Sequence, residues 1–353
     1  MIKPSAILEI NLKNLVYNYK FFTKLTKNIT VAATIKANAY GIGDLEAFKI
    51  LSKNGCKHFF VATIYEALKI RKISNQTNIY VLNGLENNNI NNFKKNNIIP
   101  IVNSKEEVNI TVKNDIKFGV HIDTGLNRLG LNQNDISNEL IKNNNFFIIL
   151  SHLSSADEKL NKFNKEQNKR FNNLKKTFGL DKIYSLANSM GAGLGNDYHH
   201  NLIRPGISLY GGHYNLSFKS KIKPVVKLKA KILQIKDISK NEFIGYNQTY
   251  KTNKIITVAI LGIGYADGLP RKLSNKGKVY LGKSVFKILG RISMDTITID
   301  ITKNRSRFKI GNYVDVINYT HGIDEFAKQC DTISNEILTN ISSRVKRIYK
   351  YNA

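Results

Sequence analysis

Polar and charged side chains stand at the ends of several apolar runs in this sequence, where they could carry out chemistry together. Lys36 ends one such run, and Arg204 lies within another. Burial of a lysine beside an apolar run lowers the pKa of its amine, which suits covalent addition to a carbonyl group. Ser189 and the backbone amides near Gly206 could hold a phosphate. A reactive lysine, a phosphate site and a buried arginine together indicate pyridoxal phosphate as a cofactor.

The elements that would position these side chains alternate along the first part of the chain. Eight short runs rich in β-branched and aromatic residues are separated by polar stretches, such as IYEALKIRK (64–72), whose apolar residues recur at helical spacing. Eight buried strands that alternate with helices predict a (β/α)8 barrel, and an open doubly wound sheet fits the same pattern less well. In such a barrel the carboxyl ends of the strands carry the chemistry. The eight runs are 30–37, 58–63, 78–83, 98–103, 116–124, 146–153, 182–188 and 202–211.

The pattern changes in the last third of the chain. Residues 227–319 hold short strand-like runs separated by Gly, Asn, Asp and Lys, which predict a mainly-β module almost without helices. We therefore expect a barrel domain over residues 1–224 and a C-terminal β domain over residues 225–353.

Three further segments have a distinct pattern. The segment AILEI (6–10) is strand-like and could join the β module. The segment after it, 11–25, predicts a helix. The Asn-rich segment 87–97 predicts a surface helix or loop.

The composition excludes several classes of protein. The chain has 353 residues, of which 42% are hydrophobic and 23% charged, which is typical of a globular protein and not of a collagen-like or disordered one. Its net charge of +28 would suit a nucleic-acid partner, but the lysines are spread along the chain and accompany an excess of Asn and Ile, as A/T-rich codons would produce. Cys56 and Cys330 form no spaced motif, so neither a disulfide framework nor a metal site is expected. The N-terminus has no signal-peptide core and the longest apolar run, 146–150, cannot span a bilayer, so we expect a cytoplasmic protein without a nucleic-acid or membrane partner.

The segment IKANAYGIG (35–43) resembles the lysine signature of the pyridoxal-phosphate-dependent alanine racemases, Lys-Ala-Asn-Ala-Tyr-Gly-His-Gly. Further motifs of that family occur in the family's order and spacing, so the resemblance covers nearly the whole chain. It implies a (β/α)8 barrel followed by a β domain, a head-to-tail homodimer, and the interconversion of L-alanine and D-alanine. The matching segments are HIDTGLNRLG (121–130), LSHLSSADE (150–158), ANSMG (187–191), IRPGISLYG (203–211), IGYNQTY (244–250), IGYADG (263–268), GRISMD (290–295) and TISNEILT (332–339).

The resemblance implies two catalytic bases. Lys36 would bind the cofactor covalently as an aldimine and would take or return the α proton on one face of the substrate. Tyr246, from the β domain of the second subunit, would do the same on the other face. Two groups on opposite faces of a planar carbanion exchange the proton with inversion. Arg204 would face the pyridine nitrogen and keep it unprotonated, and His152 would link Arg204 to Tyr246.

The resemblance also assigns the other contacts of the site. Hydroxyl groups and backbone amides would hold the phosphate, and Arg128 would lie near the ring hydroxyl. Met294 would offer its backbone amide to the substrate carboxylate, and no metal ligand is expected. The expected cofactor contacts are Lys36, Tyr40, Arg128, His152, Asn188, Ser189, Arg204, Gly206 and Ile207; the expected substrate contacts are Arg128, Met294 and Asp295; and the expected lining of the corridor into the site is Tyr265, Arg271, Arg291 and Asn335.

Three residues depart from the family pattern. Ile42 replaces a His for which we derive no catalytic role. His121 replaces a lysine that is carbamylated in many members and orients Arg128; a neutral imidazole could accept a hydrogen bond from Arg128 instead, and no carbamylation is expected. Asn335 replaces a Tyr that lines the entrance and touches the phosphate, which would widen the inner gate for side chains larger than methyl.

Rival functions stay open from the sequence. A broader amino-acid racemase, acting for example on serine, would share the motifs above. A basic amino-acid decarboxylase of the same fold type would place an acid where Arg204 stands and would need a catalytic Cys, for which Cys330 is the single candidate in the second domain. A non-catalytic pyridoxal-phosphate carrier would lack the β domain and Tyr246. The motifs favour an alanine racemase, which would supply D-alanine for peptidoglycan.

Overall fold

The structure is a computed structural model that describes residues 3–213 and 220–351. The chain forms two compact units, which are described separately. The barrel unit comprises residues 15–223, and the β unit comprises residues 1–14 together with residues 224–353.

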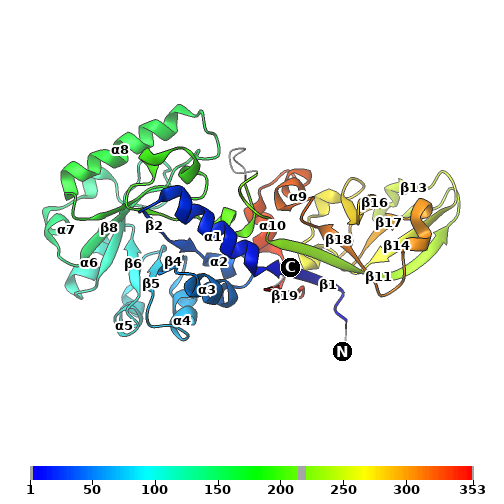
Figure 1. The fold of residues 1–353 in the computed structure, drawn as a ribbon, viewed down its shortest axis with the longest axis horizontal. Coiled ribbons are helices and arrows are strands. Elements are labelled where there is room, and N and C mark those ends of the chain that lie inside the picture. Colours follow the sequence, from blue (N-terminus) through cyan, green and yellow to red (C-terminus); the bar gives the residue numbers. More distant parts are fainter. Residues whose placement is uncertain (1–2, 214–219, 352–353) are drawn as a thin grey trace. The chain divides into compact units, whose positions relative to one another are not determined.

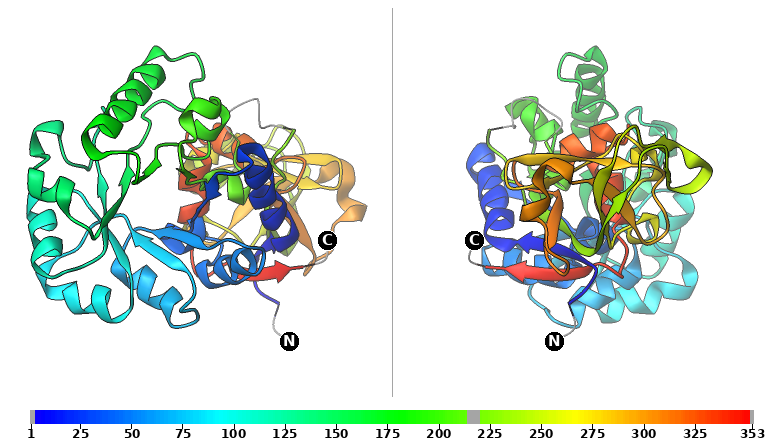
Figure 2. Two further views of the ribbon diagram at one scale, coloured as in Figure 1. Left: turned by 60° about the vertical axis from the view of Figure 1, so that its left-hand side comes forward. Right: turned by 90° about the vertical axis from the view of Figure 1, so that its right-hand side faces the viewer.

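The barrel unit is built on a closed ring of parallel strands (Figure 1, Figure 2). Seven strands, β3 to β9, pair in chain order. Both residues of β10 pair with β2, and beyond β9 the Arg204 N–H donates to the Ala187 carbonyl, so the ring closes. Because β2 and β3 are halves of one strand interrupted at Ala32, all eight predicted strands are present and the barrel prediction is confirmed. The strands are β2 (Thr30–Val31), β3 (Ala33–Thr34), β4 (His58–Val61), β5 (Asn78–Val81), β6 (Ile99–Val102), β7 (Phe118–His121), β8 (Phe146–Leu150), β9 (Ile183–Ser185) and β10 (Leu202–Ile203).

Apart from α2, which is a left-handed turn at the end of the first strand, the helices of the barrel unit lie outside the strands (Figure 1). The stretch whose apolar residues recur at helical spacing forms α4, and its Ala67 and Ile70 are buried. The Asn-rich segment forms a short 3-10 turn followed by α5, in which Phe93 is the buried residue. The helix predicted over residues 11–25 is also present. The helices are α1 (Leu12–Thr26), α2 (Lys36–Tyr40), α3 (Asp44–Lys53), α4 (Ile64–Arg71), α5 (Ile90–Lys95), α6 (Lys105–Lys113), α7 (Asn138–Lys142) and α8 (Lys162–Phe178).

The core of the barrel unit is apolar. The rings of Phe60 and Tyr80 stack with their centroids 4.4 Å apart. Each large side chain that leaves water stabilises the fold by roughly 1.5–3 kcal/mol, so this core holds the strand ends in place. The buried cluster consists of Ala32, Phe60, Tyr80, Ile99, Ile101, Ile148, Leu150 and Leu202.

The β unit is an eight-stranded sheet of order β14-β17-β16-β15-β18-β11-β1-β19, with a separate ribbon of β12 and β13. The first half of β11 pairs with β1 and β18, and its second half pairs with β14. The prediction of a mainly-β module is confirmed. Two helices, α9 and α10, follow the predicted strand-like runs and were not predicted, because each has only seven residues and so a periodic apolar face too short to detect. The elements are β1 (Ala6–Asn11), β11 (Val226–Ile238), β12 (Phe243–Ile244), β13 (Tyr250–Lys251), β14 (Ile256–Leu261), β15 (Lys278–Leu281), β16 (Ser284–Leu289), β17 (Ile297–Asp300), β18 (Tyr313–Ile317), α9 (Ile323–Gln329), α10 (Ser334–Asn340) and β19 (Lys346–Lys350).

The first strand of the chain belongs to the β unit. β1 pairs antiparallel with β11 and parallel with β19. The range 1–224 predicted for the barrel therefore loses its first 14 residues to the second unit. The barrel unit is continuous in sequence, whereas the β unit is assembled from both ends of the chain.

Two properties of residues 3–213 and 220–351 concern possible membrane and metal partners. None of their helices is both long and apolar enough to cross a membrane. They also contain no group of three or more His, Cys, Asp and Glu side chains that could hold a metal ion.

Candidate active site

Lys36 lies at the carboxyl end of the first barrel strand, just beyond β3. Burial lowers the pKa of its amine, and the guanidinium groups of Arg128 and Arg204 lower it further, whereas the Glu66 carboxylate acts in the opposite direction. A lysine in such surroundings loses its proton more readily than an exposed lysine. Its amine can therefore serve as a nucleophile or as a base.

The four residues after Lys36 form one left-handed turn. Residues 37–40 have φ angles between 51° and 55°, and the Gly41 N–H donates to the Ala37 carbonyl at 2.9 Å. This conformation costs roughly 1–2 kcal/mol for each residue that carries a Cβ. Strain of this kind is concentrated at functional sites, where the surrounding structure must hold it. The turn also explains why the predicted first strand ends early, at Thr34.

The Arg204 guanidinium is fixed at the ends of β8 and β9. Its Nη2 donates to the Ser151 carbonyl at 2.6 Å, and its Nη1 donates to the Ser185 carbonyl at 2.8 Å and to the Ser185 hydroxyl. Burial lowers the pKa of Arg204 to about 9, so the group is still a cation at neutral pH. Such a cation can lie against a heterocyclic nitrogen without giving it a proton.

His152 is held as a neutral imidazole beside Asn188. The Asn188 Oδ1 accepts the Gly191 N–H at 2.8 Å, so its Nδ2 faces the His152 Nε2 at 3.4 Å. This arrangement puts the ring proton on Nδ1. Burial, and then the charge of Arg204, hold the pKa of His152 well below its usual range. The hydrogen bonds of Arg204 described above go to Ser151 and Ser185 and not to His152. The link from Arg204 through His152 to Tyr246 therefore stays a prediction.

His121 ends β7 and is oriented by Asn103. The Asn103 Nδ2 donates to two backbone carbonyls, so its Oδ1 faces the His121 Nδ1 at 3.1 Å. The proton therefore lies on Nδ1, and Nε2 keeps the lone pair that a hydrogen bond from Arg128 would need. Burial, and then the charge of Arg204, lower the pKa of His121 to about 4. Arg128 itself lies on the exposed loop after β7 and forms no hydrogen bond within the residues that the structure describes.

The neutral His121 makes the stability of the fold depend on pH. An unfolded imidazole has a pKa of about 6.5, whereas the folded value is about 4, so the unfolded chain binds the proton first as the pH falls. The stability from this group is present above about pH 6.5 and is lost as the pH falls toward 4. Between pH 7 and pH 4.5 we expect wild type to lose about 2 kcal/mol more free energy of unfolding than His121→Gln, measured by urea unfolding. Equal losses in the two chains would show that His121 titrates normally.

Hydroxyl and amide groups form a cradle just beyond the ends of β9 and β10. The Ser189 Oγ accepts the N–H groups of Gly206 at 2.8 Å and Ser208 at 3.2 Å, which leaves its own proton to donate elsewhere. The Ser208 Oγ is buried and has no hydrogen-bond partner among the described residues. A Cβ at Gly206 would lie 2.3 Å from the Tyr40 hydroxyl oxygen, so a larger residue there would displace the Tyr40 ring. Ile207 lies in the same turn, and the whole cradle suits a phosphate, which accepts hydrogen bonds.

The loops of the β unit bring two of the other predicted residues, Tyr265 and Met294, close together. The Tyr265 N–H donates to the Ser293 carbonyl at 3.1 Å, and the Ala266 N–H donates to the Met294 carbonyl at 3.0 Å. In the described part of the chain no group accepts a hydrogen bond from the Met294 N–H. The N–H is therefore available to donate to a substrate, as its predicted role requires.

The neighbouring loops hold charged groups next to Tyr246 and Met294. The Arg291 Nη1 donates to the Asn247 Oδ1 at 3.0 Å, one residue from Tyr246. The Arg344 Nη2 donates to the Asp295 carboxylate at 2.7 Å. Tyr246, Tyr265 and Arg271 begin three 3-10 turns, Asn335 lies in α10, and Arg291, Met294 and Asp295 lie between β16 and β17.

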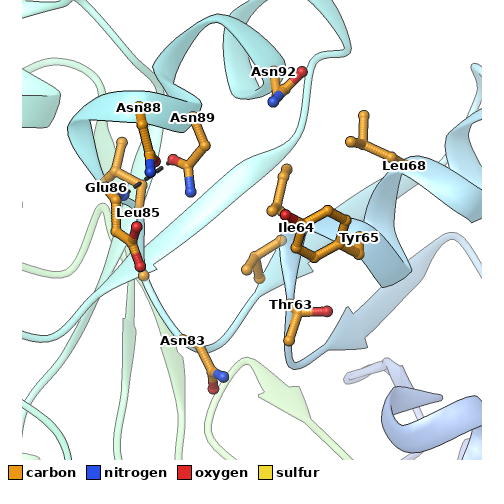
Figure 3. A pocket seen from close by; sticks show the side chains of 12 residues that line it. Thr63, Ile64, Tyr65, Leu68, Asn83, Leu85, Glu86, Asn88, Asn89 and Asn92 are labelled. Atoms are coloured by element: carbon orange, nitrogen blue, oxygen red, sulfur yellow. Dashed lines mark hydrogen bonds between the residues drawn. The ribbon is translucent and has the colours of Figure 1, made fainter.

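A pocket of about 430 Å³ opens beside α4 (Figure 3). Its lining includes one carboxylate, from Glu86, and contains no Lys or Arg. Because none of the predicted site residues lines it, this pocket is separate from the lysine and the cradle. The lining residues are Thr63, Ile64, Tyr65, Leu68, Val81, Asn83, Gly84, Leu85, Glu86, Asn88, Asn89 and Asn92.

Several residues that hold the site were not predicted from the sequence. Thr63 and Glu66 have the capping-box spacing, which would have identified Glu66 as a helix cap but not as a neighbour of Lys36. The others have no sequence signal, because their partners are distant in the chain. The missed residues are Glu66, Asn103, Ser151, Ser185 and Ser208.

Comparison with known proteins shows one family. The alanine racemase N-terminal domain matches residues 10–214, and the alanine racemase C-terminal domain matches residues 225–349. An alanine racemase of Rickettsia bellii is 39% identical over 339 residues, covering 92% of this chain and 82% of the relative, and one of Brucella abortus is 34% identical over 377 residues, covering 99% and 95%. A crystal structure of alanine racemase from Bartonella henselae with covalently bound pyridoxal phosphate has 34% identity and a TM-score of 0.92, covering 99% of this chain and 100% of that one.

Proposed function

The chain belongs to the alanine racemase family, and we propose that Lys36 and Tyr246 are the two bases with which it interconverts L-alanine and D-alanine. Like the other members of its family, it is an isomerase that depends on pyridoxal phosphate. The observation that carries the residue assignment is the place of Lys36. Its amine has a lowered pKa and shares the end of the barrel with the fixed cation of Arg204.

The barrel unit has residues that fit pyridoxal phosphate. The unpartnered Ser208 hydroxyl, the Ser189 hydroxyl and the close approach of Tyr40 to Gly206 suit its phosphate. When bound, the cofactor supplies an electron sink that makes the α proton of the amino acid removable. Lys36 would bind covalently to the aldehyde carbon of the cofactor. The full set of residues that we assign to the cofactor is Lys36, Tyr40, Arg128, His152, Asn188, Ser189, Arg204, Gly206, Ile207 and Ser208.

The two bases would work from opposite faces of the substrate. The Lys36 Nζ takes or returns the α proton on one face, and the Tyr246 hydroxyl does so on the other. One base alone would return the proton to the face it came from and so give back the same enantiomer. Arg204, which stays protonated itself, keeps the ring nitrogen unprotonated and so favours simple return of the proton over other reactions.

The test is α-proton exchange. The protein loaded with pyridoxal phosphate is incubated with L-alanine in heavy water, and the loss of the α proton is followed by NMR together with chiral analysis. We expect deuterium in both enantiomers and an approach to equal amounts of them. Exchange without inversion would refute the assignment of Tyr246 as the second base. Turnover of a larger amino acid, with no turnover of alanine, would refute the assignment of alanine as the substrate.

We also propose that the chain forms a head-to-tail homodimer, in which Tyr246 acts at the Lys36 site of a second copy. Exposed apolar side chains support this proposal. Tyr65, in the first turn of α4 after β4, and Leu129 and Leu160, on the loops after β7 and β8, are 81%, 45% and 93% exposed, and Tyr246 itself is 66% exposed. Exposed apolar side chains that gather at one end of a barrel are typical of a surface that another protein covers, here a second copy of the chain. Sedimentation should give twice the mass of one chain.

Asn335 is a candidate determinant of substrate range. It is half-buried in α10, where the family has a larger Tyr, so we expect a wider gate and weaker rejection of serine. In Asn335→Tyr the ratio of kcat/KM for alanine to that for serine should rise about tenfold, since one small group in a pocket discriminates by this order. The exposed residue Asn340 of the same helix gives the matched control, Asn340→Tyr, which should leave the ratio unchanged. A ratio that Asn335→Tyr does not alter would remove Asn335 from the gate.

For the cell, we propose that the product D-alanine is used for peptidoglycan and that the protein works in the cytoplasm. Support comes from the bacterial relatives named alanine racemase. A strain that lacks this gene product should need D-alanine for growth.

A further inference from the structure

The Glu66 carboxylate joins two loops at the carboxyl end of the barrel. Its Oε1 accepts the Ala37 N–H at 2.6 Å, in the loop after β3. Its Oε2 accepts the N–H groups of Ala62 at 2.7 Å and Thr63 at 3.1 Å, in the loop after β4. Hydrogen bonds to an ionised carboxylate are shorter and stronger than those between neutral groups. One side chain therefore ties the loop after Lys36 to the neighbouring loop.

The Ala37 N–H is a donor that the left-handed turn cannot satisfy by itself. Hydrogen bonds inside the turn come from later N–H groups, such as the one from Gly41 to the Ala37 carbonyl. The first N–H groups of any helical turn lack a partner within it. Because residues 37–40 hold a strained conformation, the turn needs contacts from outside to persist. Glu66 supplies such a contact at the residue that follows Lys36.

Glu66 also opposes the positive charges around Lys36. Among the charged groups that shift the pKa of Lys36, the carboxylate raises it, whereas Arg128 and Arg204 lower it. The imidazoles of His121 and His152 also face this site, and burial keeps both of them neutral at neutral pH. Glu66 is therefore a negative charge that makes the Lys36 amine lose its proton less readily, against the effects of burial and the two arginines.

We propose that Glu66 is a positioning residue for Lys36: by tying the turn at Ala37 to the loop at Thr63, it aims the Lys36 amine and keeps a negative charge beside it. The inference rests on the proposed function, in which Lys36 condenses with the aldehyde of pyridoxal phosphate. In that step the neutral amine forms a C=N bond to the aldehyde carbon, and the aldehyde oxygen leaves as water with the two amine protons. The step depends on both the aim and the protonation state of the amine.

The experiment measures covalent capture of pyridoxal phosphate by the cofactor-free protein as a function of pH. Absorbance gives the rate, and borohydride reduction of the C=N bond followed by peptide mass analysis identifies the lysine. The test variant is Glu66→Gln, which keeps the size of the side chain and removes its charge. The matched control is Glu46→Gln, since Glu46 lies in the first turn of α3 and pairs with Lys49 at 2.8 Å.

A second variant separates positioning from helix capping. The Thr63 Oγ1 accepts the Glu66 N–H at 3.3 Å, so Thr63→Val removes this cap and leaves the carboxylate in place. We expect Thr63→Val to lower the unfolding temperature while leaving the capture profile unchanged.

In Glu66→Gln the plateau rate of capture at high pH should fall about fivefold, since the amide has one acceptor oxygen and its NH2 group cannot accept an N–H, so the tie between the two loops is broken on one side. The midpoint of the pH profile should move to lower pH, because the amine loses its proton more easily without the carboxylate. A profile like that of Glu46→Gln, or a lower plateau with an unmoved midpoint, would overturn the proposal and leave Glu66 as a helix cap. Capture that persists in Lys36→Ala would refute the proposed function of Lys36 instead.

Discussion

Lys36→Ala is expected to lower kcat/KM for alanine racemisation by about 10⁴-fold and to end covalent cofactor binding. The variant loses the amine that holds the cofactor and one of the two bases, while the barrel strands that carry this position keep their apolar core. Racemisation is followed by polarimetry or chiral chromatography, and covalent binding by borohydride reduction and mass analysis.

The control for this variant is Lys57→Ala. Lys57 is exposed and precedes β4, at the opposite end of the barrel strands from Lys36, so its loss should leave activity unchanged. Added methylamine should restore part of the activity of Lys36→Ala, since a small amine can replace the missing base. Racemisation near the wild-type rate in Lys36→Ala would remove Lys36 from the mechanism.

Tyr246→Phe is expected to lower racemisation by about 10² to 10³-fold, since it removes one of the two bases and keeps the aromatic ring. Exchange of the α proton without inversion should persist for the one enantiomer whose α proton faces Lys36. The measurement is exchange in heavy water, started from L-alanine and from D-alanine in separate runs, with Tyr250→Phe as the matched control on the neighbouring ribbon strand β13. Equal loss of exchange from both enantiomers would contradict a two-base mechanism.

Mixing the two inactive variants tests whether each site takes residues from two chains. When Lys36→Ala and Tyr246→Phe are unfolded, mixed and refolded together, half of the random dimers are hybrids. In a head-to-tail dimer each hybrid contains one site with both bases intact, so the mixture should recover about a quarter of the wild-type activity. If each site were built from one chain, no hybrid would hold a complete site and the mixture would stay inactive.

Much of the fold was predictable because runs rich in β-branched and aromatic residues predict the strands. All eight barrel strands fall within the predicted runs, and the β sheet follows the predicted change of pattern. The length of the first strand was not predictable. It ends at Thr34 because residues 37–40 turn left-handed, and alanine and tyrosine give no local signal for that conformation. The two short helices of the β unit were missed for lack of length.

The candidate site was predictable only in part. Lys36 ends an apolar run, Ser189 follows one and Arg204 lies within one, which identifies them as polar groups near strand ends. The hydrogen-bond partners of the site residues were not predictable. Nothing in the sequence near Glu66 points to Ala37, and nothing near Ser185 points to Arg204, because these contacts depend on how the barrel closes. Local pattern predicts which side chains stand at strand ends, whereas hydrogen bonds between strands distant in the chain require the three-dimensional fold.

The pairing of β1 with β11 and β19 affects how the chain matures on the ribosome. β1 is made first, but β11 begins only at Val226 and β19 at Lys346, after the whole barrel sequence has been translated. Domains fold as units while they emerge, so the barrel can close before β1 has any partner. Throughout that interval the nascent chain carries an apolar strand with Ile7, Leu8 and Ile10 unpaired, which is the kind of edge that aggregates. Completion of the last strand, and not closure of the barrel, ends this exposure.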